Sequence, residues 1–143
     1  MRTADGMPPV LRAALIELLG EEVDEVEIVE RSWYARLHVG ARATTRRNRI
    51  LLRGTAAEFF ADPELVLHEY FHVLRQWNRG RLSIAWYVAE WLRRGYWHNR
   101  YERQARRYTR LRLPALLARL QPAADDGPGA PMPVECSPRS GAA

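Results

Sequence analysis

The feature that most constrains this chain is an apolar stretch between residues 63 and 77. Asp62 is a good N-cap and Pro63 suits the first helical position, so the sequence predicts a helix from Pro63 to about Trp77. Its apolar residues cover most of the helix circumference: Leu65, Val66, Leu67, Tyr70, Phe71, Val73, Leu74 and Trp77. A helix that is apolar nearly all round is buried, so we expect it at the centre of the core.

Three polar residues interrupt this apolar surface. They are His68, Glu69 and His72, in the pattern H-E-x-x-H. Residues i and i+4 of a helix lie on the same face, so the two imidazoles can bind one metal ion. Zinc is the expected ion, and Glu69 is the candidate catalytic base that takes a proton from a zinc-activated water. The alternative is a core helix whose histidines form ordinary hydrogen bonds.

Length and composition predict one soluble domain. Residues 1–120 are expected to form it, and residues 121–143 a disordered tail, because Pro, Gly, Ala and Ser dominate there. The single cysteine, Cys136, lies in this tail and offers no disulfide. No apolar run reaches the roughly 18 residues of a membrane span, and the N-terminus has no signal-peptide pattern. We therefore expect a cytoplasmic protein without membrane contact. The sequence does not indicate an oligomeric state.

The charge distribution leaves two interpretations open. The net charge is +5, and all 22 basic residues are arginine. Between Trp91 and Arg119 there are nine arginines and one acidic residue, Glu102. This excess permits contact with nucleic acid, although no known nucleic-acid-binding motif accompanies it. A solvated helix face produces the same pattern.

The remaining elements predict an α+β fold. Helices are expected at Val10–Leu19, Ile84–Arg94 and Arg100–Leu111, with a kink or break near Pro114. Strands are expected at Val26–Glu30, Trp33–Val39 and Arg49–Arg53. The result is a short, mostly antiparallel sheet of about three strands, packed on the helix of residues 63–77, with an N-terminal helix and two following helices.

A zinc site that performs chemistry needs a third protein ligand, and two glutamates are candidates. Glu90 can instead pair with Arg94 at i+4, and Glu102 can instead complete a capping box with Asn99. Spacing alone does not choose between Glu90 and Glu102. His38 is better interpreted as an exposed strand histidine than as a ligand.

Two motifs of this chain resemble those of small gluzin-type zincins, a group of zinc metallopeptidases that includes bacterial domains. That family has an active-site helix of the form H-E-x-x-H-V-x-x-Q, which residues 68–76 match, and a later N-P-Y-E-R-E-A helix, which is similar to N-R-Y-E-R-Q-A at residues 99–105. The resemblance covers roughly residues 40–110. It implies a small zincin-like fold, with Arg49–Arg53 as an edge strand and Glu102 as the third zinc ligand. Arg100 and Gln104 depart from the family pattern.

The function expected from these residues is zinc-dependent hydrolysis of peptide or protein substrates. Four side chains are candidates for stabilising the oxyanion: Tyr87, Tyr96, His98 and Tyr101. An extended substrate is expected to pair with the strand Arg49–Arg53. One alternative is a zincin-like protein that binds zinc without general protease activity, being latent, self-processing or specific for one partner. The other alternative is a basic protein associated with nucleic acid.

Overall fold

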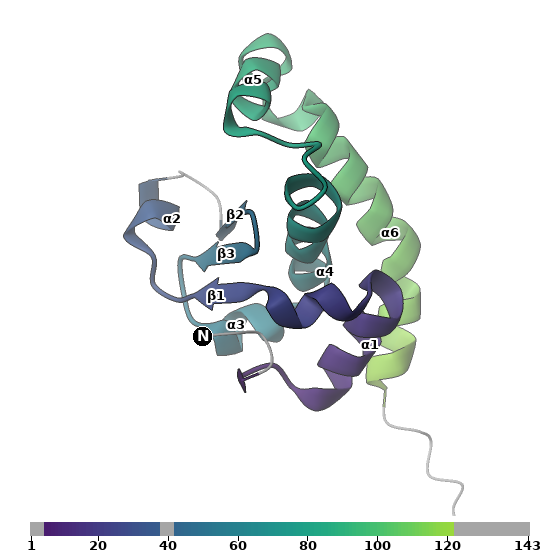
Figure 1. Ribbon diagram of the computed structural model, residues 1–143. Coiled ribbons are helices and arrows are strands. Elements are labelled where there is room, and N and C mark those ends of the chain that lie inside the picture. The colour runs from purple at the N-terminus through teal and green to yellow at the C-terminus, as the bar shows by residue number, and fades with distance from the viewer. Residues whose placement is uncertain (1–4, 38–41, 122–143) are drawn as a thin grey trace, which may run out of the picture.

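The computed structural model describes residues 5–37 and 42–121 and has an α+β fold, as predicted (Figure 1). His38 and the predicted tail from residue 122 onward lie outside the described residues. The elements in chain order are α1 (Pro9–Leu19), η2 (Glu21–Glu25), β1 (Glu27–Val29), α2 (Trp33–Leu37), β2 (Ala43–Arg46), β3 (Arg49–Leu52), α3 (Ala56–Phe60), α4 (Pro63–Phe71), η3 (His72–Trp77), α5 (Ile84–His98) and α6 (Arg100–Leu120).

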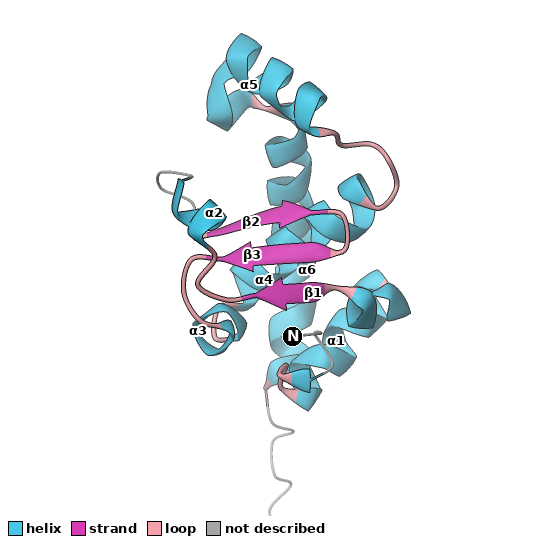
Figure 2. Ribbon diagram, turned by 60° about the vertical axis from the view of Figure 1, so that its left-hand side comes forward, coloured by secondary structure: helices cyan, strands magenta, loops and turns pink. Residues whose placement is uncertain are grey.

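The three strands form a mixed sheet in the order β1-β3-β2 (Figure 2). β1 runs parallel to β3 and β2 runs antiparallel to it, so the sheet is mixed rather than mostly antiparallel. β3 lies in the middle, and the prediction that Arg49–Arg53 forms an edge strand is therefore wrong. The edge on that side is β2, whose sequence Ala-Thr-Thr-Arg lacks an apolar alternation. β2 has only four residues, of which Ala43 alone is buried, so it contains no apolar pattern by which the sequence could have revealed it.

The predicted strand at Trp33–Val39 is also wrong, because Trp33–Leu37 forms the short helix α2. Arg31 has a positive φ of 49° and turns the chain out of the sheet after β1. The next amide, that of Ser32, donates a hydrogen bond to the carbonyl of Leu52 at 2.8 Å. Trp33 is 72% exposed whereas Ala35 is buried. Backbone bonds to the end of β3 thus override the alternating apolar pattern.

The helix with the H-E-x-x-H motif begins as predicted. The side chain of Asp62 accepts a hydrogen bond from the Leu65 amide at 3.1 Å, and Pro63 occupies the first turn. From His72 to Trp77 the helix continues as a π-helix, with wider turns than an α-helix. Such π segments occur often at functional sites. Val66, Leu67, Tyr70, Val73 and Leu74 are fully buried, so this helix is the centre of the core.

Helices surround α4 on the side away from the sheet (Figures 1 and 2). α6 packs along α4 and also contacts α1. It continues to Leu120 through Pro114, so the predicted break does not occur. Leu116, two residues after that proline, is fully buried in the core, and Arg119 pairs with Glu17 of α1. No helix among the described residues is long and apolar enough to cross a membrane.

The N-cap at Asp62 gives a testable prediction about the stability of this central helix. Asp62→Ala removes the acceptor for the Leu65 amide, and we expect it to lower the free energy of unfolding by about 1 kcal/mol in a urea titration. Asp62→Asn is the matched control, since its amide oxygen retains the cap while the ion pair with Arg42 is lost. That exposed pair contributes little. Equal destabilisation by both variants would contradict a capping role.

Candidate metal centre

Two helices bring together three side chains that can hold a metal ion: His68, His72 and Glu102. His68 lies on α4, His72 is the next turn of the same helix, and Glu102 lies in the first turn of α6. The Nε2 atoms of the two histidines are 3.1 Å apart. The Glu102 carboxylate lies 3.4 Å from Nε2 of His68 and 3.5 Å from Nε2 of His72. The ligand atoms of the three residues all lie within 4.8 Å of one another.

The cluster is buried, and His68 is its most exposed member. The side chains of His72 and Glu102 are 5% and 6% exposed, against 18% for His68. The Glu102 Oε1 atom accepts a hydrogen bond from the Tyr87 hydroxyl at 3.1 Å. Its Oε2 atom is buried and receives no hydrogen bond from the described residues. A buried carboxylate oxygen without a donor is costly, so its position beside the two imidazoles indicates a place for a cation.

A chain of hydrogen bonds fixes which nitrogen of His72 faces the cluster. The Gln76 amide donates from Nε2 to the carbonyl of Tyr101 at 3.0 Å. A carbonyl can only accept, so the Oε1 atom of Gln76 must face Nδ1 of His72, 2.7 Å away. Nδ1 therefore carries a hydrogen and donates it to Gln76. In the neutral ring this leaves the lone pair of Nε2 directed at His68 and Glu102, as a metal ligand requires.

The charges in the cluster favour a cation. Burial tends to raise the pKa of Glu102, but the imidazoles of His68 and His72 outweigh burial and hold that pKa well below its usual range. Burial tends to lower the pKa of His72, yet Glu102, Glu69 and Gln76 together raise it above its usual value. Without a metal, a proton is therefore drawn to this site. A proton and a metal ion compete for the same nitrogen.

Glu69 lies against the cluster as a buried carboxyl group, with only 8% of its surface exposed. Burial raises its pKa, and the nearby charge of Glu102 adds to this, whereas His72 and His68 act in the opposite direction. A carboxyl group with a raised pKa is a stronger base when it is ionised. The environment thus suits Glu69 to proton transfer.

Of the two candidate third ligands, the structure brings Glu102 to the histidines. Among the described residues, Glu90 belongs to no group of metal-ligating side chains that includes them. Its Oε1 atom lies 3.2 Å from Nε of Arg94, the helical pair that offered the alternative interpretation. Asn99 caps α6 by accepting from the Tyr101 amide at 2.9 Å, while the Glu102 side chain is directed to the histidines instead of completing a capping box.

The candidates for oxyanion stabilisation have different surroundings. The Tyr87 hydroxyl is bonded to Glu102, so it lies at the cluster. Tyr101 is buried, with the Arg100 guanidinium 5.0 Å from the centre of its ring. His98 is exposed, and the side chain of Tyr96 lies outside the described residues.

Sequence reasoning did not assign a role to Gln76 or Gln104. Gln76 supports His72 and also donates to Gln104 at 3.3 Å. The sequence carried a signal for Gln76, because position 76 is the Gln of the H-E-x-x-H-V-x-x-Q pattern, four residues after the second histidine. Its i+4 position allows the contact on a helix.

Comparison with known proteins finds no match among family models, curated proteins or solved structures. The resemblance to gluzin-type zincins therefore stays a prediction from the motif residues.

Gln76 supplies a test of the hydrogen-bond chain. Gln76→Leu removes the acceptor for Nδ1 of His72 in a site that is 1% exposed. We expect the affinity for a divalent metal ion to fall about 10- to 100-fold, as measured by competition with a chromogenic chelator. Gln104→Ala is the control, since it removes an exposed partner of Gln76 and leaves His72 bonded. Urea unfolding of the metal-free variants verifies the fold. An unchanged metal affinity in Gln76→Leu would show that His72 does not need the hydrogen bond from Nδ1 to Gln76 in order to bind metal.

Proposed function

We propose that this protein is a zinc-dependent metallopeptidase, with His68, His72 and Glu102 as the metal ligands and Glu69 as the catalytic base. The observation that carries the proposal is that two imidazole nitrogens lie close to the carboxylate of a second helix, beside another buried carboxyl group. One oxygen of the Glu102 carboxylate receives no hydrogen bond from the described residues. This combination supplies a binding site for a cation and a base in one place.

The donor set favours zinc. Two nitrogens and one carboxylate oxygen are a usual set for catalytic zinc sites, which keep one position open. Two ligands of a tetrahedral zinc with bonds near 2.05 Å are about 3.3 Å apart. The two histidine nitrogens are 3.1 Å apart, close to that value. One Glu102 oxygen lies 3.4 Å from Nε2 of His68 and the other lies 3.5 Å from Nε2 of His72. When bound, zinc supplies Lewis-acid chemistry that makes water nucleophilic near neutral pH.

The chain's own residues supply the remaining steps. Glu69 takes a proton from the attacking water and passes it to the leaving amine. Gln76 holds the His72 ring in its ligating orientation. The Tyr87 hydroxyl, which donates to Glu102, sets the orientation of that carboxylate. His68, the most exposed of the three ligands, marks the side from which a substrate reaches the site.

The sheet and α5 offer surfaces for an extended peptide. β3 is paired on both sides, so the expected pairing of substrate with Arg49–Arg53 is not available. β2 forms a sheet edge and contacts both α4 and η3, the two segments that carry His68 and His72. A peptide added to β2 would gain main-chain hydrogen bonds with little sequence preference. α5, which carries Tyr87, exposes Trp86 and Leu92 for contact with apolar side chains.

A second candidate function is zinc binding without general protease activity. The burial of the cluster favours it, because the side chains of His72 and Glu102 are only 5% and 6% exposed. A peptidase with a restricted entrance would accept one partner or its own chain rather than proteins in general.

The ligand assignment is tested by metal content. In protein purified without added metal and analysed by mass spectrometry, we expect about one zinc per chain in the wild type. Glu102→Ala removes a ligand and should retain less than a tenth of that zinc. Glu90→Ala is the matched control, because Glu90 is a similarly buried helical glutamate outside the cluster, and it should retain zinc fully. Equal zinc in both variants would contradict the assignment of Glu102.

The reaction is tested with Glu69→Gln, which removes the base and keeps the shape of the side chain. We expect cleavage of casein and of a peptide library to fall at least about 100-fold while the zinc content stays at the wild-type level. Equal activity in the variant would contradict Glu69 as the base. A wild type that holds zinc but cleaves neither substrate would exclude a general peptidase and support the second candidate function.

A further inference from the structure

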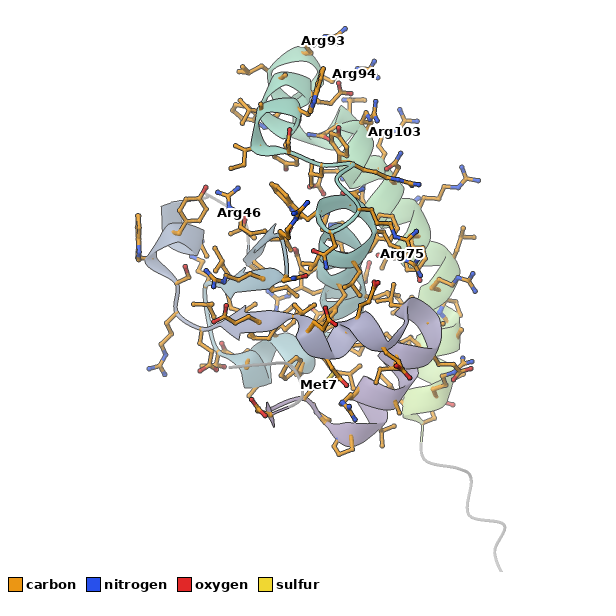
Figure 3. All side chains as sticks on the ribbon, in the orientation of Figure 1. Met7, Arg46, Arg75, Arg93, Arg94 and Arg103 are labelled. Carbon is orange, nitrogen blue, oxygen red and sulfur yellow. The ribbon has the colours of Figure 1, made fainter. Side chains whose placement is uncertain are left out.

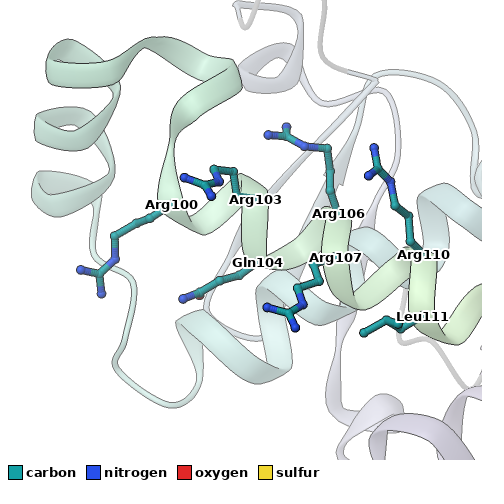
Figure 4. A pocket seen from close by; sticks show the side chains of 7 residues that line it. All are labelled: Arg100, Arg103, Gln104, Arg106, Arg107, Arg110 and Leu111. Carbon is teal, nitrogen blue, oxygen red and sulfur yellow. The ribbon is translucent and has the colours of Figure 1, made fainter.

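The outer face of α6 carries a row of arginines around an open groove of about 600 Å³ (Figure 4). The residues that line it are Arg100, Arg103, Gln104, Arg106, Arg107, Arg110 and Leu111. Figure 3 shows Arg103 projecting from this helix away from the body of the protein. The groove contains none of the metal-ligating side chains, and the metal chemistry does not account for it.

The positive charge of this face is not balanced within the described part of the chain. α6 contains one acidic residue, Glu102, which is buried and directed to the histidines. No carboxylate of the described residues forms an ion pair with Arg103, Arg107 or Arg110. Several other arginines of the described residues do have an acidic partner: Arg12 with Asp24, Arg42 with Asp62, Arg49 with Glu27, Arg94 with Glu90 and Arg119 with Glu17.

The spacing of these arginines adds repulsion. Arg103 and Arg107 are four residues apart, and Arg107 and Arg110 three, so each pair lies on one helix face. Like charges at these spacings destabilise a helix. An external polyanion would remove this repulsion, and the rigid helix would present the guanidinium groups at steps of about 6 and 4.5 Å along its axis.

We propose that this face of α6 binds the phosphate backbone of nucleic acid without reading its sequence. The guanidinium group suits phosphate because it donates two parallel hydrogen bonds. A long anion with regularly repeated charges matches a row that extends about 15 Å from Arg100 to Arg110. The groove has one apolar residue, Leu111, whereas a membrane-surface helix or a protein interface would present several.

This binding face and the metal cluster lie on different sides of the same helix. Glu102 and Ala105 are buried toward α4, while Arg103 and Arg107 are exposed. Gln104, which also lines the groove, accepts a hydrogen bond from Gln76, the partner of His72, whereas the proposal is tested at Arg103, Arg107 and Arg110. The two functions can coexist, and each can fail without the other.

The test measures binding of a fluorescent mixed-sequence DNA duplex by anisotropy between 50 and 200 mM salt. The variant Arg103→Gln/Arg107→Gln/Arg110→Gln removes three charges from the groove. The control Arg47→Gln/Arg53→Gln/Arg79→Gln removes three exposed arginines elsewhere, so both proteins change from a net charge of +5 to +2. Circular dichroism verifies that both retain the fold.

We expect the groove variant to lose at least tenfold in affinity, with its slope of log affinity against log salt shallower by about 2 to 3. The control should stay within about threefold of the wild type. Equal losses in both variants would overturn the proposal, since only net charge would then matter. The proposal would also be overturned if the wild-type protein did not bind the duplex but sedimented with vesicles containing 30% phosphatidylserine. That result would favour binding to a lipid surface.

Discussion

The interaction on which this structure depends is the contact of a buried carboxylate with one buried and one half-buried imidazole. Glu102 belongs to α6 and the histidines to the central helix, so the cluster lies where the two main helices pack together. Removing ionisable groups from water costs several kcal/mol each unless partners compensate. Here the carboxylate and the imidazoles compensate one another's charge in part, but one oxygen of Glu102 still receives no hydrogen bond from the described residues. A metal ion would satisfy all three groups at once, and this is the basis of our proposal that the cluster is a metal site.

The neighbouring residues make this arrangement specific. Gln76 bonds to His72 on its own helix and to the Tyr101 carbonyl on α6, so one side chain sets both the ring orientation and the relative position of the helices. The caps at Asp62 and Asn99 fix where each helix begins. Ligands held on helices with buried supports stay in place better than ligands on loops. On the outer face of α6, Arg103, Arg107 and Arg110 form no ion pair with a carboxylate of the described residues.

The sequence predicted the features that local physical chemistry determines. The cap at Asp62, the buried helix and the shared face of His68 and His72 follow from short spacings. Glu102 could not be separated from Glu90 by spacing, because the turn between α5 and α6 decides which carboxylate reaches α4. The strand at Trp33 was wrong because hydrogen bonds from distant residues determine that segment. The helix α3 was missed although Thr55 and Glu58 form a capping box, a pattern visible in the sequence.

The central claim is that one zinc ion lies among His68, His72 and Glu102. Its most direct test is X-ray diffraction from crystals of the protein purified without added metal, with data above and below the zinc absorption edge. Our account predicts one strong anomalous difference peak, about 2.0 to 2.2 Å from Nε2 of both histidines and from a Glu102 oxygen. A cluster with full side-chain density and no anomalous peak, in crystals soaked with zinc as well, would contradict it.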